Sequence, residues 1–233
     1  MTDASLGWAG RVMQWLGFAT RLVLVNVLFV AGALGGLLLF GLFPAAVAAT
    51  TVLARLRLGD TGGDSAGGHV VRDFARVYRT QFWHANRVGS IFWLAGVVLF
   101  LNVLTVTGTR AAASPVHAVL LVLAAVAGLG TLAAAATAVA LCSRYRDSVS
   151  STWRTAFVLP LVSPLMSLSL LATLAAAVVI FSALPVLVPL VGASLPLLLS
   201  GWLVGRRLAV LEAAETPAPA AAESAHTTVP AAA

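Results

Sequence analysis

The strongest constraint on the fold is the absence of charge over four long stretches of the chain. No Asp, Glu, Lys or Arg occurs within Leu22–Ala54, Val88–Thr109, Ala111–Ser143 or Thr155–Gly205. About 20 consecutive apolar residues are enough for a helix to cross the hydrocarbon of a bilayer. Each stretch reaches that length, so the sequence predicts an integral membrane protein built of helices.

The composition also indicates a mostly embedded chain. Of the 233 residues, 60% are hydrophobic and 9% are charged, whereas soluble domains average about 25% charged residues. All 14 basic residues are arginines, and the formal net charge is +6. In so apolar a chain, this basic balance favours anionic lipid headgroups as partners and argues against nucleic acid, which requires a soluble basic face.

We predict an all-α polytopic membrane helix bundle of about five spans. Within a transmembrane domain of residues 20–210, the spans are expected near 22–42, 89–108, 115–142, 157–181 and 184–205. Residues 1–19 carry apolar side chains at helical spacing, which predicts an interfacial amphipathic segment. Residues 211–233 are rich in Ala and Pro and predict a disordered tail. The first apolar run exceeds the roughly 7–15 residues of a signal-peptide core, so we interpret it as a retained span.

The first span is expected to be broken. Pro44 lies inside the charge-free run, and proline in a helix interior removes a hydrogen bond and kinks the axis. We therefore expect a break at Phe43–Pro44, followed by a second helical piece from Ala45 to about Leu58. This piece is expected to be re-entrant or to lie along the cytoplasmic surface.

The arginines predict the orientation of the chain. Eleven of the 14 form three groups that are separated by pairs of spans, namely Arg55–Arg87, Arg144–Arg154 and Arg206–Arg207. All three groups therefore lie on one face, which the positive-inside rule makes cytoplasmic, together with the C-terminus of a protein of the cell (inner) membrane. A single first crossing places Arg11 and Arg21 outside, and a hairpin places them inside. The run supplies about 50 Å of helix, too little for two crossings of roughly 30 Å, so a single crossing with a bent extension is preferred.

Residues 69–87 predict a cytoplasmic interfacial helix. Apolar and aromatic side chains recur at helical spacing on one side, and the other side carries Arg72, Arg76, Arg79 and Arg87. Trp83 is expected to anchor this helix among the headgroups, where the arginines contact the membrane surface or a partner.

No catalytic apparatus is visible in the sequence. Cys142 is the single cysteine, and neither His84 nor His117 has a second ligand at helical spacing. Asp60 and Asp64 lack the regular ligand spacing and closing Glu of a calcium loop. We therefore predict a non-enzymatic protein with no catalytic residue, cofactor or metal.

Two polar side chains and two glycine pairs lie within the apolar runs. Asn26 and Asn102 are interpreted as interhelical hydrogen-bonding groups, with a substrate path as the alternative. Gly32–Gly36 and Gly201–Gly205 have the spacing that lets helices approach closely, which favours internal packing over homo-oligomerisation.

Two stretches carry a family resemblance. An apolar span with an Asn leads into a Gly-x-Phe-Pro-Ala turn, and an aromatic amphipathic helix ends in Phe-Trp-x-Ala-Asn-x-x-Gly; the matching residues are Asn26, Gly41, Pro44, Ala45, Phe82, Trp83, Asn86 and Gly89. Over about residues 20–95 this combination resembles the YesL-like bacterial integral membrane protein family, which has no known function.

The resemblance implies a five- or six-span inner-membrane protein. Genomic association of the family's members further implies a role beside carbohydrate ABC transporters. It carries over no catalytic residues. Gly41 and Pro44 are expected to break the first helix, and Asn86 with Gly89 to turn the interfacial helix into the second span.

The leading hypothesis is a non-enzymatic accessory or scaffold component associated with a (carbohydrate) ABC transporter. Its partners would be the lipid bilayer and transporter subunits. One alternative is a small transporter that binds a neutral solute through Asn26, Asn102, Ser163 and Ser167. The other is an anionic-lipid-sensing membrane protein that acts through residues 69–87.

Overall fold

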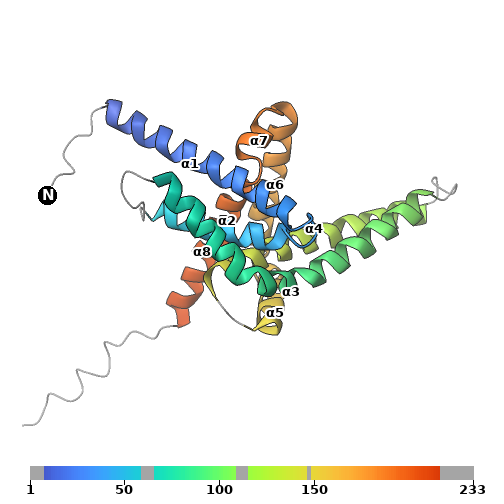
Figure 1. Cartoon of the computed structure of the whole chain (residues 1–233). Coiled ribbons are helices and arrows are strands. Elements are labelled where there is room, and N and C mark those ends of the chain that lie inside the picture. The colour runs from blue at the N-terminus through green and yellow to red at the C-terminus, as the bar shows by residue number, and fades with distance from the viewer. Residues whose placement is uncertain (1–7, 59–65, 109–114, 146–147, 216–233) are drawn as a thin grey trace, which may run out of the picture.

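The structure, a computed structural model, describes residues 8–58, 66–108, 115–145 and 148–215. Their regular structure is entirely helical, in the order α1 (Trp8–Gly35), α2 (Leu42–Arg57), α3 (Ala66–Gly108), α4 (Pro115–Arg144), α5 (Val149–Val162), α6 (Pro164–Ala183), α7 (Leu187–Val191) and α8 (Ser194–Glu215) (Figure 1). The predicted all-α polytopic bundle is confirmed. Within these described ranges, four helices rather than about five are long and apolar enough to cross a membrane: α1, α3, α4 and α6.

The centre of the bundle is α2. Its side chains from Phe43 to Thr50 are buried, as are Val52 and Leu53. It packs against α1, α3, α4 and α8, and the small alanine side chains along it let these neighbours approach closely. The helix is therefore an internal element of the protein, which corrects the expectation of a piece lying along the surface.

A hairpin connects α1 to α2. The turn lies at Gly36–Gly41, where Leu37 and Leu38 have left-handed backbone conformations, with φ of 57° and 61°. Beyond the turn α2 runs back along α1, since Leu22 and Leu53 belong to one buried cluster. The structure thus contains the hairpin and not the preferred single crossing. The length argument fails because α2 is enclosed by protein and does not need to span hydrocarbon by itself.

The break precedes Pro44 instead of falling at it. Pro44 is the third residue of α2, where the backbone N–H has no partner within the helix. Proline is tolerated in a first turn for this reason. The turn ends at Gly41. The residue there is glycine because a side chain would collide with the backbone of Gly32 and Ala33.

The predicted interfacial helix and second span form a single helix, α3. Its continuous run of 43 residues corresponds to about 65 Å. Its first half packs against α1 and α2, and Figure 1 shows its outer half extending beside the outer half of α4 beyond the other helices. The expected turn at Asn86–Gly89 is absent.

The last two expected spans are each divided. The span 157–181 is split between α5 and α6 at Ser163, directly before Pro164. The span 184–205 is split between α7 and α8 at Gly192–Ala193. At the two ends, α1 begins within the expected 1–19 segment, and α8 extends into the expected 211–233 tail; residues 1–7 and 216–233 lie outside the described residues.

Candidate functional site

The α1–α2 hairpin packs against α3 around Ala45, one of the motif residues. Gly32 lies against Ala45 of α2 and against Phe74 and Tyr78 of α3. The Tyr78 hydroxyl donates a hydrogen bond of 2.9 Å to the Gly32 carbonyl. Ala45 is fully buried. Ala45 therefore belongs to a packing unit that joins three helices.

Gly89 and Asn86 serve the same junction inside α3. A Cβ on Gly89 would lie 2.6 Å from the Phe43 ring of α2, and that ring stacks on Phe92. Asn86 donates within the helix to the Phe82 carbonyl at 3.0 Å. Gly89 therefore permits close helix approach and is not a turn, which explains why α3 continues through it. Trp83 is exposed, as an interfacial anchor requires.

Asn26 binds the break between α7 and α8. Its side-chain NH₂ donates to the Pro189 carbonyl at 2.7 Å and to the Val188 carbonyl at 3.4 Å. Its carbonyl accepts from the backbone N–H of Ala193 at 2.9 Å and of Ser194 at 3.4 Å. Backbone N–H and carbonyl groups at helix ends lack hydrogen-bond partners within the helix. The side chain of Asn26, which is 1% exposed, provides these partners.

The four polar residues proposed to form a solute path do not gather. Ser163 accepts a hydrogen bond from Arg207, which lies 13 residues, or about 20 Å of α8, beyond the segment that Asn26 binds. Ser167 donates to the Pro160 carbonyl at 2.8 Å. Asn102 is exposed on the outer half of α3. The described residues therefore give no support to a common solute site built from these four.

The arginines of the predicted interfacial helix share one face of α3. Arg72, Arg76, Arg79 and Arg87 are all exposed, and at 3.6 residues per turn they fall within about 80° of one another. The described part of the chain provides no salt bridge to any of the four. Asp73, beside them, pairs with Arg55 of α2 at 3.2 Å.

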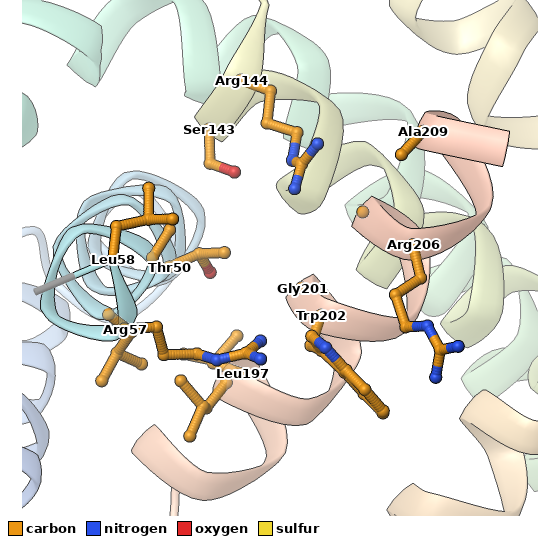
Figure 2. A pocket seen from close by; sticks show the side chains of 14 residues that line it. Thr50, Arg57, Leu58, Ser143, Arg144, Leu197, Gly201, Trp202, Arg206 and Ala209 are labelled. Carbon is orange, nitrogen blue, oxygen red and sulfur yellow. The ribbon is translucent and has the colours of Figure 1, made fainter. Parts of the chain in front are cut away.

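A second basic site lies where the C-terminal ends of α2 and α4 meet α8. A cavity of about 310 Å³ is lined there by Arg57, Arg144 and Arg206, one arginine from each of the three groups in the sequence. Figure 2 shows Arg57 and Arg206 flanking Trp202, with guanidinium carbons 5.5 and 4.9 Å from the ring centroid. These distances are those of cation–π contacts.

Sequence reasoning missed this pocket. The Gly201–Gly205 pair was available as a signal, and its interpretation as internal packing was only part of the answer. A side chain at Gly201 would meet Thr50 of α2, and one at Gly205 would meet the Arg144 guanidinium. The two glycines thus let α8 approach α2 and admit an arginine from α4. Among the described residues, no group of three or more His, Cys, Asp or Glu side chains is positioned to hold a metal ion.

The fold and its two basic surfaces define a polytopic, all-helical membrane protein. Residues 22–103 match a family described as "Protein of unknown function, DUF624", which confirms the YesL-like resemblance. The chain is 30% identical over 100 residues to the uncharacterized protein YteU of Bacillus subtilis (strain 168), a match that covers 43% of this chain and 41% of that relative. No solved structure matches the chain. The family match over residues 22–103 covers the second half of α1, all of α2 and most of α3.

Proposed function

We propose that the protein is a non-enzymatic accessory or scaffold component that binds the membrane subunits of a transporter, with a carbohydrate ABC transporter as the partner. It would be a multi-pass protein of the cell membrane with its arginine groups and C-terminus in the cytoplasm. The observation that carries the proposal is the hairpin formed by the outer halves of α3 and α4, which the rest of the described chain leaves uncovered.

This hairpin has features that favour a protein neighbour over lipid alone. An added Cβ at Gly96 of α3, or at Gly128 and Gly130 of α4, would meet nothing within 4 Å. Such open small-residue positions let a second helix approach closely in a membrane. Asn102 is exposed on the same hairpin, and an amide in an apolar environment gains from a hydrogen-bonding partner.

The arginine face of α3 supplies a second contact. Because α3 is continuous, a partner held in the membrane by its outer half is aligned with the arginines of its inner half. These arginines are exposed and free to pair with acidic groups of a cytoplasmic partner domain. The same side chains would serve the anionic-lipid-sensing alternative.

Affinity purification from native membranes tests the proposal. The wild-type protein should recover the same membrane protein reproducibly. Replacing Gly128 and Gly130 by Leu should abolish recovery, because the larger side chains prevent close helix approach. Replacing Val178 and Val179 of α6, which are also exposed, by Leu should leave recovery unchanged. Failure to recover any membrane protein besides the chain itself would refute the accessory role.

A further inference from the structure

The pocket between α2, α4 and α8 concentrates positive charge that the described residues do not neutralise. Asp73 is the one acidic residue whose side chain is described, and it pairs with Arg55 outside the pocket. None of the described lining residues is acidic. Three arginines therefore line the pocket. Figure 2 shows the guanidinium groups of Arg57 and Arg144 on its open side and that of Arg206 on the far side of Trp202.

Helix-end electrostatics explains part of this arrangement. Arg57 and Arg144 lie in the last turns of α2 and α4, where the negative end of the helix dipole attracts a cation. This effect accounts for each of these two arginines alone. It does not account for Arg206, which lies within α8, or for the cavity that the three side chains line.

Part of the pocket lining is apolar. Leu53, Leu197 and Leu198 contribute this apolar surface. Trp202 lies beside the arginines, and tryptophan is enriched at the membrane–water interface. The pocket thus presents apolar and cationic groups together at the ends of apolar helices.

We propose that this pocket binds a phosphate group, held by Arg57 and Arg144, with Arg206 adding positive charge beside Trp202. Guanidinium groups pair with phosphate oxygens through two parallel hydrogen bonds, and two of them suit the several oxygens of one phosphate. Two sources carry this chemistry, an anionic phospholipid headgroup and a soluble phosphate. Basic pockets between membrane helices commonly bind the former. This site is separate from the α3 surface assigned to the transporter partner.

The test measures the melting temperature of the full-length, delipidated protein in detergent during three titrations, with phosphatidylglycerol, phosphatidylcholine and inorganic phosphate. A rise with phosphatidylglycerol alone identifies a lipid headgroup, and a rise with inorganic phosphate identifies a soluble ligand. Either result supports the proposal. No rise with phosphatidylglycerol beyond that with phosphatidylcholine, together with no rise with phosphate, overturns it.

Variants separate the pocket from general charge attraction. The triple variant R57Q/R144Q/R206Q should raise the half-saturating concentration at least about tenfold, because it removes the charge-assisted hydrogen bonds of Arg57 and Arg144 and the positive charge of Arg206. The matched triple R11Q/R21Q/R154Q removes the same charge from positions that do not line the pocket and should change it by less than about twofold. Equal losses in the two variants would overturn the proposal.

A glycine substitution tests the site without changing the charge. In Gly205→Ala the new methyl group displaces the Arg144 guanidinium, so binding should weaken while all arginines remain. Gly96→Ala is the matched control, since the space at Gly96 is open, and it should bind as the wild type does. If Gly205→Ala binds phosphate or phosphatidylglycerol with unchanged affinity, Arg144 is not a ligand and the proposed site is refuted.

Discussion

At the residue scale, polar side chains in the apolar runs hydrogen-bond to backbone groups, and small residues there let helices pack closely. Asn26 shows this most clearly, since its amide satisfies carbonyl and N–H groups on both sides of the α7–α8 break. The sequence predicts an interhelical hydrogen bond for Asn26. Its partner is not predictable, because the broken helix is 162 residues or more away along the chain.

Replacing Asn26 tests this role. Asn26→Ala leaves buried backbone groups without partners, and each costs about 1–3 kcal/mol. The free energy of unfolding in detergent should therefore fall by at least that amount. Asn102→Ala removes the same amide from an exposed position and should change it by less than about 0.5 kcal/mol. Similar losses in the two variants would show that the Asn26 contacts do not stabilise the fold.

Gly89 provides a second residue-scale test. Alanine favours a helix over glycine by up to about 1 kcal/mol, so a glycine without tertiary contacts should tolerate the change. At Gly89 the new Cβ meets Phe43, and overpacking typically costs about 1–3 kcal/mol. Gly89→Ala should lower the thermal stability, Gly96→Ala should not, and Phe43→Leu should reduce the effect of Gly89→Ala. A stabilised Gly89→Ala protein would contradict the close approach.

At the element scale, local composition predicts helices well and their ends less well. The charge-free runs give α1, α3, α4 and α6 as membrane candidates, because membrane insertion depends on local hydropathy. Pro44, Asn86 and Gly89 were expected to interrupt helices. All three lie inside helices, since a first turn tolerates proline and a neighbouring aromatic ring requires glycine.

The continuity of α3 can be measured directly. Spin labels at Val71 and Leu101, both exposed, are separated by 30 residues, which gives about 45 Å along an unbroken helix. Cys142 is buried and should take up no label. Pulsed electron–electron distance measurements should give a single peak near that value. A peak below about 35 Å would restore the turn between an interfacial helix and a span.

At the scale of the whole molecule, the sequence predicts a shared face for the arginine groups but not their neighbours. Arg57, Arg144 and Arg206 line one pocket, in agreement with the pairing of spans between the groups. The pocket itself depends on which helices pack together. Hydropathy does not predict that α2 is the central helix of the bundle. Residues 59–65 and 109–114, which include Asp60, Asp64 and Arg110, lie outside the described residues.

Because α2 runs back along α1, we predict that Arg11 and Arg21 lie on the same face of the membrane as the three arginine groups. Single cysteines at Gln14 and Leu58, both exposed, should react with a membrane-impermeant maleimide from the same side of sealed vesicles. Because the positive-inside rule applies, that side should be cytoplasmic. Reaction of the two positions from opposite sides would contradict the hairpin and restore the single crossing.

The most direct test of the scaffold role is site-specific photocrosslinking in the native membrane. A photoreactive residue at Leu101, on the uncovered hairpin, is compared with one at Val179 of α6; both positions are exposed. The account predicts a defined adduct with a transporter subunit from Leu101 and none from Val179. Adducts from Leu101 only with a second copy of this chain, or the same adducts from both positions, would contradict it.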